Sequence, residues 1–294
     1  MQLGIFARTF VRPSLDDTLD AVKSYGLDCL QFNFSCIGQP TLPESIDPAL
    51  AFRIRTELEK RSLAMVAVSG TCNLIHPDPA QRAQCLRRLQ TMIPACREFG
   101  TSVVTLCSGT RDATDMWRSH RENHSLSARR DLRTSLETLL PLAEKHDVTL
   151  GIEPELANVI ATAQQARQLL DELKSPCLKI VFDAANLLTS HALSEQGSVL
   201  SEAAHLLGAD TVLAHGKDLS FEVPKLTVAA GTGGLDYSLY LSLLERAGFN
   251  GAIVLHSLAE TEVPASVAFL RSQLNRRATR NTGQSNALLQ PRPN

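Results

Sequence analysis

The sequence predicts a single (β/α)8 TIM barrel, because short apolar segments alternate with longer amphipathic segments along a chain of 294 residues. The apolar segments do not alternate between apolar and polar residues, which is typical of parallel strands buried on both faces. We count eight such segments, at residues 2–6, 28–34, 63–70, 101–107, 148–153, 178–183, 210–215 and 251–256. Eight strand–helix units in about 275 residues match the usual length of this barrel.

The segments between the strands have the pattern of amphipathic helices. They are predicted at residues 15–26, 48–62, 79–100, 126–147, 162–173, 198–208, 237–249 and 264–277. Three of them end on a glycine shortly before the next strand, at Gly26, Gly100 and near Gly248, where the left-handed backbone of a helix end favours glycine. The competing architecture, an open doubly wound sheet, is disfavoured because no GxGxxG motif follows the first strand.

The barrel is predicted to occupy residues 1–277, followed by a tail at 278–294. The tail is polar and contains glycine and two prolines, which predicts disorder.

Composition narrows the classes of partner. The formal net charge is −2, which argues against nucleic acid and against an anionic membrane surface. No stretch of about 18 apolar residues is present, and the N-terminus lacks the features of a signal peptide. We therefore expect a cytoplasmic protein. The seven cysteines are odd in number and form no CxxC pair, so we expect buried, reduced thiols.

Four consecutive strands end on residues that can bind a metal. The residues are Glu153, Asp183, His215 and His256. Each has an ordinary structural explanation alone, since a strand-end aspartate is often a turn or cap residue. Active sites of these barrels lie at the C-terminal ends of the strands, so the four together predict one divalent metal at the barrel mouth.

Four motifs resemble the xylose isomerase-like barrel superfamily, which includes sugar phosphate isomerases and epimerases and AP-endonuclease-type proteins. The motifs are GIEPE (151–155), IVFDAANLL (180–188), AHGKD (214–218) and GTGGLDY (231–237). The resemblance covers roughly residues 1–275 and implies metal ligands at Glu153, Asp183 and His215. The family usually supplies a second glutamate from strand eight, where this chain has His256.

The resemblance implies an isomerase or epimerase that abstracts a proton beside a carbonyl and forms a metal-held enediolate. Glu153 is the expected base. The family's ketose epimerases use two glutamates on opposite faces of the substrate, so His256 is expected either as a metal ligand or as the second acid/base group. Glu155 and Glu260 are the reserve candidates for that second role.

The mixed oxygen and nitrogen ligand set suits Mn, Co, Zn or Mg, and the resemblance to sugar isomerases makes Mn the first expectation. Two carboxylates with neutral histidines would leave the site about neutral. Such a site holds a deprotonated substrate oxygen more readily than one with three carboxylates.

Six further residues are candidates for substrate binding. Asn186 and Lys217 follow the metal motifs, and the long segment 109–124 carries Trp117 with arginines, which suits a sugar or sugar phosphate. The full set is Asn186, Lys217, His76, Trp117, Arg111 and Arg8. A plain salt bridge for Lys217 and packing of Trp117 on the barrel rim remain open alternatives.

Other functions are also open on this scaffold. A lyase could dehydrate an inosose or a dehydroshikimate-like acid by the same proton abstraction, and a non-catalytic relative could bind sugar without metal. A DNA repair phosphodiesterase is disfavoured, because it would need about three metals and a basic face. The expected partner is a small carbohydrate, and assembly as a homodimer or homotetramer is compatible with the sequence.

Overall fold

The computed structural model describes residues 1–189, 193–220, 222 and 227–288. Eight parallel strands close into a barrel in the order β1–β2–β3–β4–β5–β6–β7–β9, with β9 returning to pair with β1. These strands are β1 (Gln2–Phe6), β2 (Cys29–Phe32), β3 (Ala64–Ser69), β4 (Val103–Cys107), β5 (Thr149–Glu153), β6 (Leu178–Asp183), β7 (Thr211–Leu219) and β9 (Ala252–Leu255). The predicted (β/α)8 fold is confirmed.

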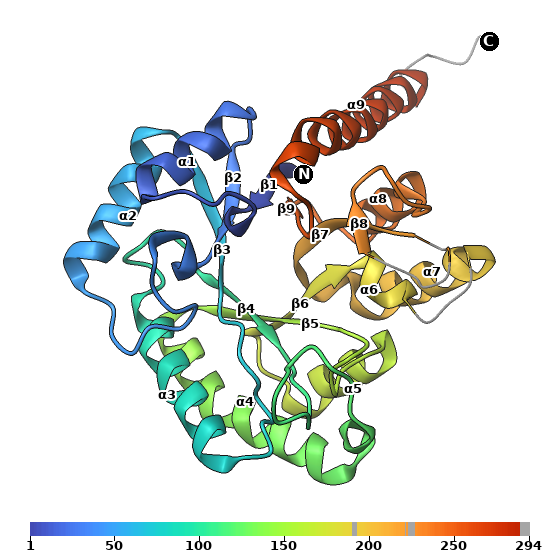
Figure 1. Ribbon diagram of the computed structural model, residues 1–294. Coiled ribbons are helices and arrows are strands. Elements are labelled where there is room, and N and C mark those ends of the chain that lie inside the picture. The colour runs from blue at the N-terminus through green and yellow to red at the C-terminus, as the bar shows by residue number, and fades with distance from the viewer. Residues whose placement is uncertain (190–192, 221, 223–226, 289–294) are drawn as a thin grey trace.

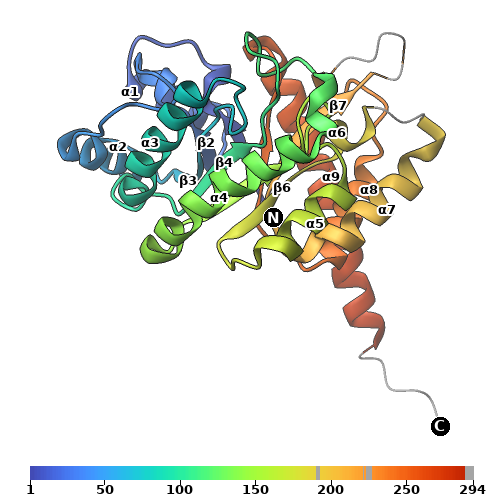
Figure 2. The same ribbon diagram turned by 90° about the horizontal axis from the view of Figure 1, so that it is seen from below.

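Helices surround the strands on the outside, as Figure 1 shows in one view and Figure 2 from below. The α-helices are α1 (Leu15–Ser24), α2 (Pro48–Lys60), α3 (Pro79–Ala95), α4 (Leu126–His146), α5 (Ala163–Leu173), α6 (Ala184–Leu188), α7 (Gln196–Leu207), α8 (Tyr237–Arg246) and α9 (Val263–Leu288). Short 3-10 turns lie at Ala7–Thr9, Phe34–Ile37, Arg121–His124, Leu193–Glu195, Gly208–Asp210 and Glu260–Glu262.

Local sequence explains where these helices start and stop. Asp47 and Asp78 each accept a backbone hydrogen bond at the start of α2 and α3, and proline follows at the first helical position of both. Gly26, Gly100 and Gly248 adopt φ values of +70°, +103° and +83°, as the helix-end pattern predicted.

Two features near the site were not predicted. The seventh strand continues past His215 to Leu219 and pairs antiparallel with a short strand, β8 (Thr227–Ala229). The short helix α6 begins directly after Asp183, whose side chain caps it. Both features fix polar residues just beyond the strand ends, where the site lies.

The core has two parts. A large cluster joins the helices to the outer faces of the strands. A second buried cluster consists only of strand residues, as the filled interior of such a barrel requires. Its members are Phe6, Cys29, Ala67, Val181, Leu213, Ala252 and Val254.

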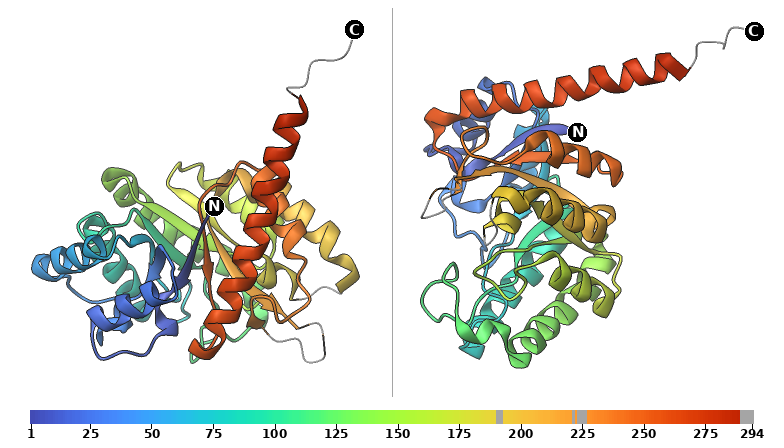
Figure 3. Two further views of the ribbon diagram at one scale, coloured as in Figure 1. Left: turned by 90° about the horizontal axis from the view of Figure 1, so that it is seen from above. Right: turned by 90° about the vertical axis from the view of Figure 1, so that its right-hand side faces the viewer.

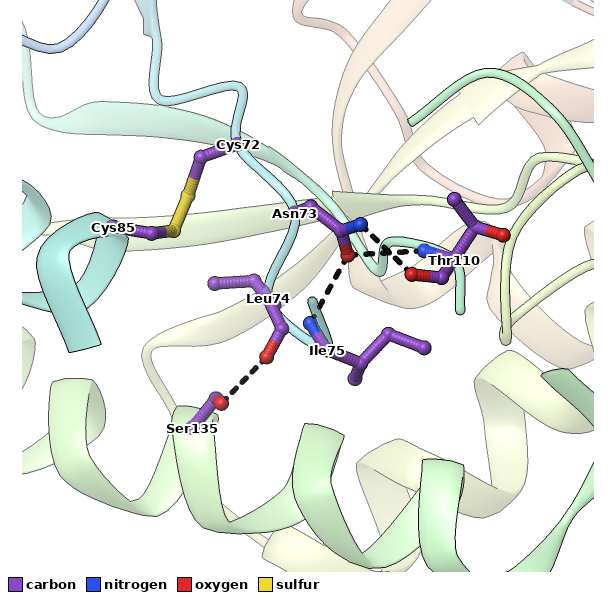
Figure 4. The surroundings of a disulfide bond; sticks show 7 residues. All are labelled: Cys72, Asn73, Leu74, Ile75, Cys85, Thr110 and Ser135. Carbon is purple, nitrogen blue, oxygen red and sulfur yellow. Dashed lines mark hydrogen bonds between the residues drawn. A yellow bond between two sulfur atoms is a disulfide. The ribbon is translucent and has the colours of Figure 1, made fainter. Parts of the chain in front are cut away.

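The expectation that all the cysteines are reduced is wrong for two of them. Cys72 and Cys85 form a disulfide with a Cα–Cα distance of 6.1 Å (Figure 4). Cys72 follows β3 and Cys85 lies in α3. The loop between them turns the chain back, so that the two cysteines meet although their separation of 13 residues matches no known cysteine motif. The five other cysteines are free.

The loop that carries Cys72 is also held by hydrogen bonds. Asn73 donates from its amide to the carbonyl oxygen of Thr110 at 2.8 Å, and the Ser135 hydroxyl donates to the carbonyl oxygen of Leu74 at 2.7 Å (Figure 4). These bonds tie the loop after β3 to the loop after β4 and to α4.

The last helix extends beyond the predicted end of the barrel. α9 continues through residues 278–288, which the sequence places in a tail, and projects away from the barrel (Figure 3). Residues 289–294 of the predicted tail lie outside the described part of the chain. Among the described residues, no helix combines the length and the apolar character that a membrane span requires.

Candidate metal centre and substrate cavity

Three of the four predicted strand-end residues converge. Glu153 ends β5, Asp183 ends β6 and His215 lies beside Asp183 in the register of β6 and β7. One ligand atom from each residue lies within 4.8 Å of the others. His215 Nδ1 is 3.2 Å from Glu153 Oε1 and 3.3 Å from Asp183 Oδ2. Two carboxylates and an imidazole in this arrangement can hold a divalent cation.

Asp183 is 1% exposed and its two oxygens have different surroundings. Oδ1 accepts a hydrogen bond from the backbone N–H of Asn186 at 3.0 Å. Oδ2 is buried and has no aligned hydrogen bond, and its close neighbours are the cationic Nζ of Lys217 at 2.9 Å and the ring of His215. Burial by itself would raise the pKa of Asp183, but Lys217 and His215 outweigh it and hold the pKa below its usual value. An ionised, buried oxygen without a directed partner fits a metal ligand.

His215 is held by a polar chain that the sequence analysis missed. Its Nε2 lies 3.0 Å from Gln31 Oε1, and Gln31 Nε2 donates to Thr105 Oγ1 at 3.1 Å. An amide oxygen at Nε2 favours a proton on that nitrogen, so the lone pair of Nδ1 faces Glu153 and Asp183. Gln31 was detectable as a polar residue within the apolar segment 28–34.

The charge of the carboxylates also acts on His215. Burial lowers the pKa of His215, but Glu153 and Asp183 overcome this and raise the pKa to about 9. A divalent cation must displace that proton in order to bind at Nδ1, which couples metal binding to proton release.

Asn186 joins two carboxylates and a lysine. Its Nδ2 donates to Glu153 Oε1 at 2.7 Å and to Glu155 Oε2 at 2.9 Å, and its Oδ1 accepts from Lys217 Nζ at 2.9 Å. Asn186 is only 6% exposed and lies on α6, the helix that Asp183 caps. Burial raises the pKa of Glu155 to about 7. The structure thus brings Glu155, a reserve candidate, into the centre.

A cavity of about 340 Å³ opens beside these groups. It is lined by Arg8, Trp117, Glu153, His215, Lys217 and His256 from the predicted set, and by Glu155. Unpredicted lining residues include Phe6, Gln31, Thr71, Thr105 and Cys107. Trp117 is 53% exposed and so borders the opening.

His256 lies directly after β9 and outside the group of three ligand atoms. Its ring stacks on Phe6 at 5.0 Å between centroids and is 4.8 Å from the ring of His215. Nδ1 lies 2.6 Å from Ser257 Oγ. Burial, followed by the charges of His215 and Lys217, lowers the pKa of His256 well below its usual value. Its role as ligand or as acid/base group stays a prediction.

Three predicted or reserve residues lie elsewhere. The ring of His76 accepts from the backbone N–H of Asp78 and borders a separate hollow beside the disulfide. Arg111 forms an ion pair with Asp131 at 2.7 Å and donates to the carbonyl of Ile75. Glu260 pairs with Arg12. None of the three is among the described residues that line the 340 Å³ cavity.

The family model "Xylose isomerase-like TIM barrel" matches residues 19–273. The chain therefore belongs to the xylose isomerase-like TIM barrel family, which confirms the resemblance of the four motifs. A comparison with curated proteins finds no match.

Solved structures of the same fold include two sugar epimerases and the IolI protein. An L-ribulose 3-epimerase has a TM-score of 0.73 and 17% identity, with 99% of each chain covered. The 3-keto-D-glucoside 4-epimerase of E. coli has a TM-score of 0.73 and 16% identity, covering 92% of this chain and 99% of its own. The IolI protein, with a bound zinc atom, has a TM-score of 0.66 and 16% identity, covering 93% and 96%. These likenesses show the fold.

Proposed function

We propose that this protein is a divalent-metal-dependent isomerase or epimerase that acts on a small sugar or sugar phosphate. The observation that carries the proposal is the convergence of Glu153, Asp183 and His215 beside a cavity that Glu153 and His215 line. Two of the similar structures are sugar epimerases by name, which supports a carbohydrate substrate.

The residues present fit a divalent metal. The donor set is two carboxylate oxygens and Nδ1 of a histidine whose other nitrogen is held by Gln31. The buried Asp183 Oδ2 has no aligned hydrogen bond. A bound divalent ion would polarise the substrate carbonyl and stabilise negative charge that develops on oxygen. Mn is our first choice, and similar structures with zinc and with magnesium support Zn and Mg as alternatives.

Glu153 is the proposed base that takes the proton from the carbon beside the carbonyl. Its carboxylate lines the cavity, and Asn186 holds one oxygen at 2.7 Å, which fixes the direction of the side chain. A carboxylate positioned in this way can serve as a general base.

His256 is the proposed second proton carrier. Its ring lines the cavity, and the stacking on Phe6 and the contact of Nδ1 with Ser257 fix the ring plane. Glu155 is the competing candidate, because it also lines the cavity and shares Asn186 with Glu153. Variants of the two residues distinguish these roles.

The cavity favours a small polar substrate. Its volume of about 340 Å³ lies near the lower end of small-molecule sites, which span about 300–1,000 Å³. Arg8 and Trp117 border it, and a lining that offers both a cation and an aromatic ring suits a sugar or its phosphate.

The test is solvent deuterium exchange. Ketoses, inososes and their phosphates are incubated with the protein and Mn²⁺ in D₂O, and the carbons next to the carbonyl are followed by NMR and mass spectrometry. We expect exchange with at least one candidate and none with Glu153→Gln. A protein that binds Mn²⁺ but exchanges no proton on any candidate contradicts the proposal and favours a non-catalytic sugar-binding relative. A product lighter by one water would instead indicate the dehydratase.

A further inference from the structure

Lys217 is placed by its strand against the oxygens that would hold the metal. It follows His215 by two residues on β7, so the two side chains point to the same face of the strand. Its backbone is fixed by the pairing with Ala229 on β8 and by the hydroxyl of Tyr237, which donates to the Lys217 carbonyl at 2.7 Å. The side chain is therefore held at the metal centre by the strand extension that the sequence did not predict.

The ammonium of Lys217 is buried among acceptors. The residue is 5% exposed, and Nζ lies 2.9 Å from Asp183 Oδ2 and 3.6 Å from Glu153 Oε1. These are the two oxygens that also face His215 Nδ1. Among the described residues, no other lysine or arginine is within ion-pair distance of either carboxylate. Lys217 is thus the lysine that Asp183 and Glu153 share, beside the ring of His215.

A metal and this ammonium would share a ligand oxygen. A divalent ion bound to Asp183 Oδ2 lies about 2.0–2.2 Å from it, so it would be within about 5 Å of an ammonium in the observed position. Two like charges this close in a buried site repel strongly. The Oδ1 of Asn186 and the cavity give the ammonium an alternative direction, since Lys217 contacts both.

We propose that Lys217 is an internal counter-cation that competes with the divalent metal and sets its affinity. In the metal-free protein it compensates the buried charge of Asp183 and Glu153. With a metal bound, the ammonium of Lys217 and the metal ion would repel each other. A substrate that brings an anionic oxygen between these two cations would relieve the repulsion, so metal and substrate would bind cooperatively. This inference rests on the proposed metal site and adds to it a residue that determines affinity.

The direction of the effect separates this role from a structural one. A lysine that only supports the site would lower metal affinity when it is replaced. Removal of a competing cation would raise the affinity, because it takes away a fixed positive charge beside the two carboxylates that would bind the metal.

The experiment compares Mn²⁺ binding by isothermal titration calorimetry in the wild type, Lys217→Gln, Lys217→Met and Lys217→Arg. Gln keeps a hydrogen-bond donor without charge, so it carries the test even if Met at a buried polar position does not fold. Lys179→Met is the matched control, because Lys179 is a strand lysine paired with Asp210 at 2.6 Å away from the site.

We expect Lys217→Gln to bind Mn²⁺ about tenfold more tightly or better, while Lys217→Arg and the control stay within about twofold of the wild type. Lys217→Gln should also melt at a lower temperature without metal and gain more from Mn²⁺ than the wild type. Unchanged or weaker Mn²⁺ binding in Lys217→Gln overturns the inference. If the wild type binds Mn²⁺ and exchanges substrate protons regardless, the proposed function stands without it. If no form binds metal, both fail.

Discussion

Nε2 of His215 lies 3.0 Å from the side-chain oxygen of Gln31, a contact between β7 and β2 across the barrel. The sequence separation of the two residues is 184, and His215 is the only ligand-candidate histidine in the group of three. The contact engages one ring nitrogen of His215, and the other, Nδ1, faces Glu153 and Asp183 at the proposed metal site.

Gln31→Leu should weaken Mn²⁺ binding by about 10- to 100-fold, because the ring of His215 loses the acceptor that fixes its orientation. Calorimetric titration with Mn²⁺ measures the effect. Thr105→Val removes only the hydroxyl that accepts from Gln31, so it should reduce the affinity for Mn²⁺ by less than Gln31→Leu does. Equal affinity in Gln31→Leu and the wild type would show that the contact does not position the ligand.

Glu153→Gln and Asp183→Asn should each reduce bound metal below one ion per chain after dialysis. Each change removes a charged oxygen that would bind the metal. The loss of metal affinity should therefore exceed the roughly 100-fold that is typical when a residue that only hydrogen-bonds to a ligand is lost. Elemental analysis measures the stoichiometry. Asp210→Asn is the control, since Asp210 pairs with Lys179 and Arg167 outside the centre. Full metal content in both site variants would eliminate this centre.

His256→Gln decides between the two roles of the strand-eight histidine. If His256 is a proton carrier, the variant should lose about 100-fold or more in kcat, while its metal content stays at one ion per chain. As a ligand, its loss would weaken Mn²⁺ binding. Activity and metal content are measured on the same preparation. Unchanged values of both would exclude His256 from either role and favour Glu155.

Cys72 and Cys85 should be unreactive until the protein is reduced. Thiol titration of the denatured protein should give five groups without reductant and seven with it. Cys72→Ser together with Cys85→Ser should lower the free energy of unfolding by about 3 kcal/mol, since the bridge closes a short loop. Cys177→Ser is the control. Seven reactive thiols in the unreduced protein would contradict the disulfide.

Much of the architecture could be predicted because it depends on local pattern. Apolar strands of similar length with helices between them specify a parallel barrel, and parallel register places successive strand ends on one rim. Glu153, Asp183 and His215 stand at such strand ends, and they lie together in the structure. Lys217 lies two residues after His215, so its side chain is expected on the same face of the strand. The extension of β7 that holds Lys217 depends on pairing with β8, however, and β8 has no clear sequence signal.

The tertiary structure alone decided what the loops and cross-barrel contacts do. His76 and Arg111 follow strands toward the same rim, yet their side chains turn to Asp78 and Asp131 instead of the cavity. The hydrogen-bond partner of His215 is Gln31, which is 184 residues away in the sequence. Direction in a loop and contact across a barrel depend on which neighbours satisfy each polar group, and those neighbours are distant in sequence. The sequence therefore determined which residues stand at the strand ends, and the packing determined the contacts that Lys217 and Gln31 make with them.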